Sequence, residues 1–581
     1  MARLIFDIET NGLNPSIVWV IVTKDIDTGV VHSFTEAPIG SGRRGWDAFN
    51  DYVAQATEVI GHNIIGYDIP VCERLLGTDF SKATIVDTLV MSRLANPQRE
   101  SHSLKWWGEQ LEYPKGDYND WSCYTVEMRD YCEQDVNVNE QVYRRVLSEL
   151  DSFGDQSILL EHNVQTIIQK QVRNGWLLDV PKARDLVALL KERSYTLEEE
   201  VQKVFIPLPT FVKEVQPKTK KDGSISIVGL KFLGDRWTDV GGDFSRIDWP
   251  VFNLGSRQQI GRYLVHFGWK PKVFTETGHA IVSEDVLTNV KGIPEAALIA
   301  SYLLVGKRIA QVRSWLESAD ETTDRVHGYV NTNGAVTGRM THSKPNLAQV
   351  PSSSSLYGPE CRGCWIVSKG YKLVGIDASG LELRMLAHYM NDVDYTNTIL
   401  TGDIHTANML AAGLTDRNQA KTFIYAYLYG AGDEKIGSIV GGGRMAGKKL
   451  KASFLKATPA LAELKDNVAN SASKGYVTGL DGRKIFIRSE HAALNSLLQS
   501  AGAIVMKQAL ILLDKYAILY GLDYKLVGNC HDEIQAEVLE AHAKRFGQLA
   551  VSCMEAAGLH FKLRCPLSGE YKVGNSWAET H

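Results

Sequence analysis

The sequence predicts a protein built from several α/β and α+β domains. Its 581 residues exceed what one hydrophobic core holds, because a domain averages roughly 150 residues. Strand-like and helix-like patterns alternate over residues 1 to about 150, which indicates an α/β domain. Two further strand patterns, "KLVGIDASG" and "KLVGNCHDEIQAEV", are separated by long helical stretches, which favours an α+β domain assembled from distant segments.

The composition is that of a soluble globular protein, with 44% hydrophobic and 23% charged residues. The net charge of -5 does not by itself indicate a nucleic-acid partner, so local charge must decide that question. Eight cysteines without a framework spacing fit a reducing cytoplasm. We find no uninterrupted apolar stretch long enough to span a bilayer, and we expect no membrane association.

Between the two strand-containing regions, residues 151 to about 316 are mostly helical in pattern. Residues 207 to 250 interrupt the helices with a segment rich in Lys, Gly, Pro and β-branched residues. This composition predicts a hairpin or a loop insert.

Two acids stand on one face of the first predicted strand. In "LIFDIET" the period of two places Asp7 and Glu9 side by side. Neighbouring carboxylates repel each other, and their hard oxygen atoms suit Mg²⁺ or Mn²⁺. The signal alone is weak, because Asp25 and Asp27 in "DIDTG" have the same spacing in what is more simply a polar turn.

Further acids raise the specificity of this pattern. "GHNIIGYD" supplies Asp68, and "YCEQD" places Tyr131 and Asp135 on one helical face. Cleavage of a phosphodiester by two metal ions needs carboxylates to hold the metals and a group to orient the attacking water. The order and spacing resemble the DEDD-type 3′→5′ exonucleases of the tyrosine subclass, although each motif alone is more often a surface ion pair.

A second pair of acids lies in the later strands. Asp377 ends the strand of "VGIDASGLELR", and "GNCHDEIQAEV" places His531, Asp532 and Glu533 at the predicted tip of a hairpin. Separately, these are a common helix cap and a common solvated turn. Together, Asp377 and Asp532 predict a site that holds two Mg²⁺ ions for nucleotidyl transfer.

The helical stretch "RNQAKTFIYAYLYGAG" repeats a functional group every fourth residue. Arg417, Lys421, Tyr425 and Tyr429 therefore form one slowly winding stripe that ends before Gly430. The cations suit a triphosphate, and the phenol rings suit stacking on bases. Without the two aspartates, an ordinary amphipathic helix would be the preferred interpretation.

Taken together, these motifs resemble family A DNA polymerases, most closely the branch found in T-seven-like short-tailed bacteriophages. The resemblance extends over nearly the whole chain and includes "GDIHT", "GLDGRK", "HAALNSLLQSAGA", "NTNGAVTGRMTHSKPNLAQVP", "FNLGSRQQIGRYL" and "GNSWA". It implies an RNase H-like exonuclease domain followed by a right-hand polymerase. The implied division is exonuclease 1–150, thumb 151–316 with an insert at about 207–250, palm 317–400 and 486–581, and fingers 401–485.

The resemblance also implies a role for each matching residue. The polymerase metals would be held by Asp377, Ala378 and Asp532, with His531 beside the primer terminus and Glu533 in support. The exonuclease metals would be held by Asp7, Glu9, Asp68 and Asp135. The triphosphate would contact His405, Arg417 and Lys421, and the sugar would meet Tyr425 and Glu382. Tyr429 and Gly430 would face the template, and Arg339 and Gln499 would donate to minor-groove acceptors.

The cofactors implied are two Mg²⁺ ions in each active site, with Mn²⁺ as a substitute. The partners implied are primer–template DNA and deoxynucleoside triphosphates, in the cytoplasm of an infected bacterium. Host thioredoxin or another processivity factor, and a replicative helicase or primase, are candidate partners. The exonuclease region is compact and the thumb insert is short for a thioredoxin-binding relative. We therefore expect the insert to contact the DNA backbone itself.

Local charge agrees with DNA binding, since "GGGRMAGKKLKASFLK" carries five cations and no acid. Three alternatives stay open at this point. A stand-alone 3′→5′ exonuclease has no use for Lys421 or Asp532, and a single-subunit RNA polymerase should not carry Glu382 where a ribose hydroxyl must fit. A non-enzymatic DNA-binding protein explains the basic runs but not the paired carboxylates.

Overall fold

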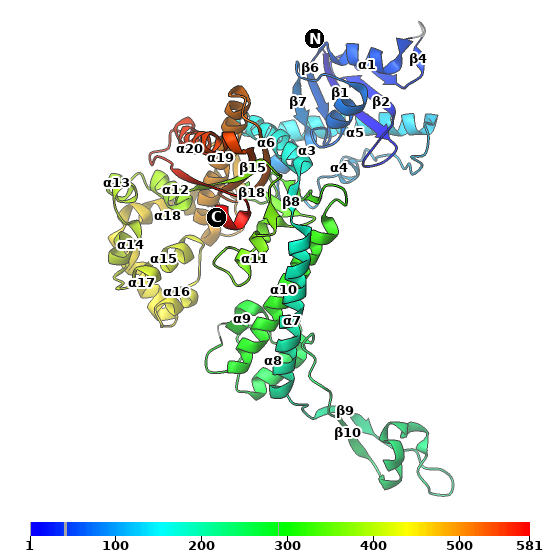
Figure 1. Cartoon of the computed structure of the whole chain (residues 1–581), viewed down its shortest axis with the longest axis vertical. Coiled ribbons are helices and arrows are strands. Elements are labelled where there is room, and N and C mark those ends of the chain that lie inside the picture. Colours follow the sequence, from blue (N-terminus) through cyan, green and yellow to red (C-terminus); the bar gives the residue numbers. More distant parts are fainter. Residues whose placement is uncertain (1, 40–42, 289) are drawn as a thin grey trace. The chain divides into compact units, whose positions relative to one another are not determined.

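The computed structural model describes residues 2–39, 43–288 and 290–581, which divide into two compact units. The larger unit joins Met1–Asp179 to Ser318–His581, and the smaller is Val180–Glu317. Figure 1 follows the chain through both units. Each unit is described separately below.

The larger unit begins with a five-stranded sheet in the order β3-β2-β1-β6-β7. Its central strand β1 is antiparallel to β2 and parallel to β6. The strand bounds are β1 Ala2–Thr10, β2 Val18–Asp25, β3 Val31–Phe34, β6 Ala56–Gly61 and β7 Thr84–Asp87, with a small separate pair β4 Pro38–Ile39 and β5 Arg43–Arg44. The helices are α1 Gly45–Val53, α2 Asp68–Leu76, α3 Thr88–Ala95, α4 Leu104–Gln110 and α5 Val126–Leu150.

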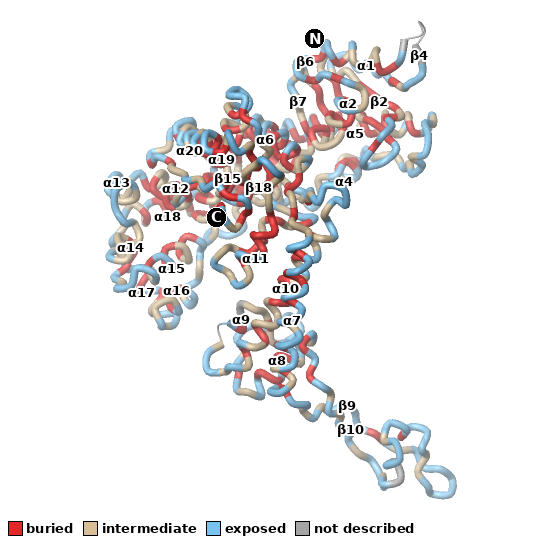
Figure 2. Tube along the Cα trace, viewed as in Figure 1, coloured by how far each residue is buried: buried red, intermediate tan, exposed pale blue. Residues whose placement is uncertain are grey.

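The two faces of β1 enter different hydrophobic cores. Leu4, Phe6 and Ile8 pack with α1, whereas Ile5 packs with α5. Because side chains alternate along a strand, Asp7 and Glu9 lie on the α5 side with Ile5. The strand's hydrophobic pattern therefore orients both acids toward α5. Figure 2 shows the buried strands of this sheet in red.

A four-stranded antiparallel sheet forms the second part of the larger unit, in the order β18-β19-β15-β20. It joins β15 Tyr371–Ala378 to three strands that begin more than 140 positions later, β18 Tyr524–Cys530, β19 Glu533–Leu539 and β20 Gly569–Gly574. The helices that share its core include α12 Leu381–Met390, α19 Glu490–Leu519 and α20 Ala543–His560. The fold class expected from the sequence is confirmed.

Short elements complete this part of the larger unit. They are β11 Arg325–Val326, β12 Tyr329–Asn331, β13 Thr341–Ser343, α11 Gly358–Arg362, β14 Trp365–Ile366 and α21 Trp577–Thr580, with 3₁₀ turns at Leu347–Gln349 and Glu540–His542.

A helical segment between β15 and α19 packs on the same hydrophobic core. Its central helix α15, Arg417–Leu428, buries Phe423 and Ile424 and leaves Arg417 and Lys421 exposed. The other elements are α13 Val393–Thr401, α14 Ile404–Ala412, α16 Asp433–Ile439, α17 Arg444–Ala457, α18 Pro459–Ala472, β16 Tyr476–Thr478 and β17 Lys484–Phe486.

Helix α6, Asp155–Asn174, differs from the predicted division of the chain. We placed it at the start of the thumb, but it belongs to the larger unit, together with β8 Trp176–Leu178. Val164, Ile167 and Ile168 join the core of the four-stranded sheet, which explains the difference. The periodicity correctly predicted a helix here, but it did not show which core the apolar face of that helix packs against.

The smaller unit is built around the long helices α7 Val180–Val204 and α10 Pro294–Ser318. Both contribute to one core with α8 Arg257–His266 and α9 Glu284–Thr288. Within the region of the predicted insert, β9 Thr210–Val215 and β10 Phe244–Asp248 form an antiparallel pair, with 3₁₀ turns at Ile227–Gly229 and Lys231–Asp239. Figure 2 shows this pair as mostly exposed.

Helix α19 bears on the expectation that no segment of the chain spans a membrane. It is long and apolar enough to cross a membrane by length and composition, with a mean hydropathy of 1.5 in its most apolar window. However, 72% of that window is buried inside the protein. This is the character of a core helix.

Candidate active sites

The first candidate site collects the four acids predicted near the N-terminus. Asp7 and Glu9 come from β1, Asp68 begins α2, and Asp135 lies on α5 one turn after Tyr131. The pKa of Asp7 is raised well above its ordinary value, first by burial and then by the charges of Asp68 and Glu9. The structure therefore brings these carboxylates into one mutually repelling cluster.

Burial is the first cause for the other members of this cluster as well. Burial raises the pKa of Glu9 to about 8, with a further contribution from Asp135. Burial also raises the pKa of Asp68 to about 7 and that of Asp135 to about 6. In addition, the Oδ1 atom of Asp135 is buried and has no hydrogen-bond partner among the described residues. A set of hard oxygen donors that holds excess negative charge and an unpartnered atom fits a divalent cation.

Lys115 is a member of this site that the sequence analysis missed. Its Nζ atom lies 2.5 Å from Oδ2 of Asp135 and 4.8 Å from the ring centre of Tyr131. Lys115 precedes α5 in a segment without regular structure, so no periodic pattern connects it to the acids. It partly neutralises the cluster and lies against the tyrosine.

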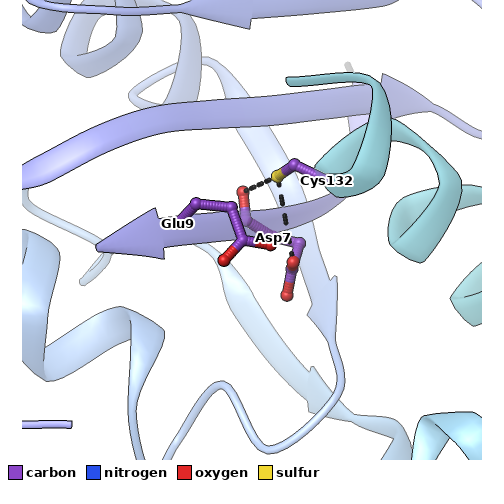
Figure 3. Close-up of side chains that lie close together, drawn as sticks. All are labelled: Asp7, Glu9 and Cys132. Carbon is purple, nitrogen blue, oxygen red and sulfur yellow. Dashed lines mark hydrogen bonds between the residues drawn. The ribbon is translucent and has the colours of Figure 1, made fainter. Parts of the chain in front are cut away.

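Cys132 adds a sulfur atom beneath the acids. Its thiol donates to the backbone carbonyl of Asp7 at 3.4 Å and lies 3.8 Å from Oδ2 of the same residue. Figure 3 shows these two contacts and the neighbouring Glu9 on β1. Because the thiol is buried and bonded to the strand, its contact fixes α5 against β1 at the site.

An open cavity of about 760 Å³ adjoins this cluster. Its lining combines cations and aromatic rings, and includes His62, Arg93, His102, Lys105, Lys115, Tyr118 and Tyr131. Such a lining suits a flexible polyanion that carries stackable rings.

The second candidate site forms where β15 meets the β18–β19 turn. The backbone N–H of Ala378 donates to the carbonyl of Asp532 at 3.2 Å, and Asp377 is in register with Glu533. Burial, followed by the charge of Asp532, raises the pKa of Asp377 to about 6. His531 occupies the turn with a φ of 60°, a conformation that few side chains adopt. The predicted hairpin tip thus places Asp532 beside Asp377.

Glu533 has different surroundings from its neighbour Asp532. It is buried and accepts hydrogen bonds from Gln535 at 2.6 Å and from Trp577 at 2.5 Å, and His581 lies 3.1 Å away. Burial opposes ionisation, but the bonds from His581 and Gln535 outweigh it and hold the pKa of Glu533 below its usual value. Glu533 therefore anchors the C-terminal residue beneath the site, a contact that sequence patterns gave no sign of.

The cationic end of the α15 stripe lies beside α14. Arg417 forms two hydrogen bonds with Asp403, at 2.6 and 3.1 Å, and Asp403 also caps α14 at its first residues. Burial and the charges of Arg417 and Lys421 lower the pKa of His405. The three predicted triphosphate contacts are thus close to one another, and Asp403 is the counter-ion of Arg417.

The aromatic end of the stripe lies beside α12. The rings of Tyr425 and Tyr429 stack with centres 6.5 Å apart. The Tyr429 hydroxyl is 2.8 Å from both carboxylate oxygens of Glu382, and Arg339 lies 3.2 Å from Glu382. Glu382 is therefore held by Tyr429 and Arg339.

Two remaining predicted residues flank this group. Gly430 follows α15 with a φ of 73°, and a Cβ there would stand 3.0 Å from the backbone oxygen of His491. Glycine suits this position for both reasons. Gln499 lies half-buried on α19.

Comparisons with known proteins cover the two regions of the chain that hold these sites. A family model described as DNA polymerase family A matches residues 238–579, and one for the RNase H superfamily matches residues 4–146. The chain is 34% identical to the DNA-directed DNA polymerase of Enterobacteria phage T3 and 33% identical to that of Escherichia phage T7, each over the full length of both chains. Both alignments span 710 positions, so the phage enzymes hold segments without a counterpart in these 581 residues.

A solved structure gives the same fold. The polymerase domain of Pol1 from M. smegmatis, in complex with DNA primer–template and dNTP, superposes with a TM-score of 0.78 at 18% identity. The match covers 99% of this chain and 95% of that chain.

Proposed function

This chain belongs to DNA polymerase family A, and on that premise we propose that its two carboxylate clusters are two separate active sites acting on the same DNA end. The site at Asp377 and Asp532 extends a primer 3′-hydroxyl with deoxynucleotides. The site at Asp7, Glu9, Asp68 and Asp135 removes nucleotides in the 3′→5′ direction. The observation that carries the proposal is that Asp377 and Asp532 meet where β15 ends, with the backbone N–H of Ala378 bonded to Asp532. The charge of Asp532 also acts on Tyr425 of α15, the helix that exposes Arg417 and Lys421.

Family A polymerases depend on divalent metal ions. In this chain the metals of the polymerase site would be held by Asp377, Asp532 and the backbone of Ala378, and those of the exonuclease site by its four acids. When bound, Mg²⁺ or Mn²⁺ supplies Lewis-acid activation of the attacking oxygen and neutralises charge at the phosphates. The carboxylate oxygens and the unpartnered Oδ1 atom of Asp135 fit that role.

For the incoming nucleotide, we assign the triphosphate to His405, Arg417 and Lys421. Arg417 is already oriented by its paired bonds to Asp403, so a triphosphate would share or replace that carboxylate. Its surroundings lower the pKa of His405, which favours the neutral imidazole, and a neutral imidazole can donate one ring hydrogen to a phosphate oxygen. Tyr425, next in the stripe, stacks on the nucleotide and limits space at the sugar together with Glu382.

For the template and the primer, we assign Tyr429 and Gly430 to the template side, and Arg339, Gln499 and His531 to the primer end. Minor-groove acceptors occupy similar positions in A·T and G·C pairs, so donors there sense pair geometry rather than sequence. Because Glu382 receives bonds from both Tyr429 and Arg339, the sugar and the minor-groove contacts are mechanically linked.

In the exonuclease site, Tyr131 orients the attacking water, and Lys115 holds Tyr131 and Asp135 in place. The adjoining cavity, with Arg93, Lys105 and Tyr118 in its lining, receives the single-stranded 3′ end. This assignment explains why cations and rings surround a strongly acidic centre.

We keep the domain division predicted from the sequence, except that α6 and β8 join the palm. The smaller unit, Val180–Glu317, is the proposed thumb. Its hairpin exposes Phe211, Ile247 and Trp249, at 61%, 52% and 64% of their surfaces. These apolar side chains favour a protein partner such as thioredoxin for the hairpin, whereas its lysines favour direct contact with DNA.

By likeness to the phage T3 and T7 enzymes, we propose that the chain replicates phage DNA in the cytoplasm of an infected bacterium, and a helicase or primase is a further candidate partner. Primer extension in Mg²⁺ tests the proposed function. Deoxynucleotides should lengthen the primer, ribonucleotides should not, and without nucleotides the primer should shorten from its 3′ end. Failure to extend the primer with deoxynucleotides would contradict the proposal and favour the alternative, a stand-alone 3′→5′ exonuclease.

A further inference from the structure

Four charged side chains are buried together in the larger unit, apart from both carboxylate clusters. They are Glu161 on α6, Asp481 and Arg483 in the β16–β17 hairpin, and Lys507 on α19, and each is at most 3% exposed. We call them the buried charge network. Two acids and two bases make its net charge zero.

Every member of the network is paired at short distance. Lys507 donates to both oxygens of Glu161 at 2.6 and 2.8 Å, and Arg483 lies 2.7 Å from the same carboxylate. Arg483 also donates to Asp481, with contacts from 2.6 to 3.0 Å. Glu161 thus binds two cations, Arg483 and Lys507, that both lie far from it in the sequence.

A network of buried charges does not give a protein core its greatest stability. Removing a charged group from water costs several kcal/mol, and apolar residues of similar shape often give equal or greater stability. A buried network that does not maximise stability is better explained by the geometry that it imposes. The question is then which groups it positions.

Two contacts lead from the network to the proposed polymerase site. The guanidinium of Arg483 fills the space next to Gly338, where a Cβ would stand 2.8 Å from its Nη1 atom. Gly338 has a φ of 73° and directly precedes Arg339. The position of Arg483 therefore limits where the backbone at Arg339 can lie.

The second contact is through Lys507. It lines a cavity of about 20 Å³ together with Arg339, Asn529 and His531. This volume holds about one water molecule. Lys507 thus lies directly behind two residues that we assign to the primer end. In addition, Gln165, one turn along α6 from Glu161, accepts a hydrogen bond at 2.8 Å from Thr332, in the segment that leads to Arg339.

We propose that the buried charge network is a positioning device that sets Arg339 and His531 at the primer terminus and so determines how strongly the enzyme rejects a mispaired end. This inference rests on the proposed polymerase function. Glu161, Arg483 and Lys507 are positioning residues, because they act through Arg339 and His531 and do not touch DNA. If Arg339 is displaced, its donor no longer distinguishes a correct pair from a mispair.

The test uses the full-length chain with Asp7→Ala and Glu9→Ala, so that degradation does not obscure extension. Single-nucleotide addition is measured on a paired and on a mispaired primer end, with kcat and KM determined separately. Lys507→Met should lower the paired-to-mispaired ratio about tenfold, and the exchange Glu161→Gln with Lys507→Met, which removes one charge of each sign, should do the same. Arg339→Ala should have a similar effect, and adding Lys507→Met to it should change the ratio little, because both act through one group.

The matched control is Arg325→Met. Arg325 forms a buried ion pair with Glu537 at 2.7 Å in the same unit, about five strand positions away from Asp532 along β19. It should lower the thermal midpoint without changing the ratio. If Lys507→Met leaves the ratio unchanged, or if its effect multiplies with that of Arg339→Ala, the positioning role is wrong.

The positioning role can still be tested if one of the variants does not fold. If Lys507→Met fails to fold, the charge-balanced pair of substitutions and Lys507→Arg provide the same comparison, and a ratio equal to the parent in both would overturn the inference. The proposed function fails separately, since in that case the parent enzyme would not extend a paired primer at all.

Discussion

The hydroxyl of Tyr429 lies 2.8 Å from each carboxylate oxygen of Glu382 and donates its hydrogen to that carboxylate. Tyr429 ends the α15 stripe, and Glu382 begins α12, so one bond joins the proposed template side to the proposed sugar side of the nucleotide site. Burial, with this bond, raises the pKa of Tyr429 and keeps its hydroxyl a donor. The Tyr429–Glu382 bond therefore links the proposed template contact to the proposed selection of the sugar.

Tyr429→Phe should therefore weaken the exclusion of ribonucleotides. The change removes one hydrogen bond to a charged group, and such bonds contribute about 1.5–3 kcal/mol, so incorporation of ribonucleotides relative to deoxynucleotides should rise roughly ten- to hundredfold. Glu382→Ala should have a larger effect, because it removes the blocking side chain itself. Competition between the two nucleotide types measures both, and an unchanged ratio in Glu382→Ala would refute the proposed role of Glu382.

Tyr425→Phe should change the choice between deoxynucleotides and dideoxynucleotides. Within the family that the chain belongs to, a tyrosine hydroxyl at this position accompanies ready use of dideoxynucleotides. Loss of that hydroxyl should shift preference strongly toward deoxynucleotides, with little effect on extension by deoxynucleotides alone. Chain-termination ladders measure the shift, and equal termination by the variant and the parent would contradict the role given to Tyr425.

The raised pKa values in the proposed exonuclease site predict that the stability of the fold decreases as pH rises. The pKa values of Glu9, Asp68 and Asp135 are raised to about 8, 7 and 6 in the folded state. Between pH 4 and pH 8 the folded state thus binds more protons than the unfolded state, so this contribution to stability is present in acid and is lost as pH rises. In a chelator, the thermal midpoint should fall from pH 5.5 to pH 8.5.

The matched comparison is Asp7→Asn with Glu9→Gln, which removes two of the repelling charges. This variant should match the parent at pH 5.5 and exceed it at pH 8.5, and Mg²⁺ should raise the midpoint of the parent alone at the higher pH. If the thermal midpoint fell equally with rising pH in both proteins, the acids of this cluster would not have the raised pKa values.

Deleting residues 213–228 from the proposed thumb should shorten the products and reduce the salt dependence of DNA binding, if the lysines contact phosphates directly. Lys218, Lys220 and Lys221 changed together to Gln should reproduce that loss. A protein partner predicts a different result, in which Phe211→Ser with Trp249→Ser abolishes the response to thioredoxin and leaves the salt dependence unchanged. Product length with and without thioredoxin separates the two.

Local periodicity predicted the parts of the sites that lie on single elements. The period of two put Asp7 and Glu9 on one face of β1, and the helical period put Tyr131 and Asp135 on one face of α5. A turn between two apolar runs predicted that Asp532 lies at a hairpin tip. The α/β and α+β classes followed from the same patterns, whereas the RNase H-like and polymerase folds followed from the resemblance to a known family, and both are confirmed.

Other contacts depend on tertiary packing, and the sequence carried no sign of them. Lys115 reaches Asp135 from a segment without regular structure, and His581 reaches Glu533 from the end of the chain. Glu161 and Lys507 are 346 positions apart. In the sequence alone, charged residues such as these resemble solvated surface residues. For the same reason, the sequence does not show that α6 packs within the larger unit.

The central claim is that Asp377 with Asp532, and Asp7 with Glu9, serve two separate reactions. Primer extension and 3′→5′ shortening of the same labelled primer, in Mg²⁺, test this claim most directly. Asp532→Ala should reduce extension to background and leave shortening near normal, and Asp7→Ala with Glu9→Ala should do the reverse. Extension at the normal rate by Asp532→Ala would contradict the account.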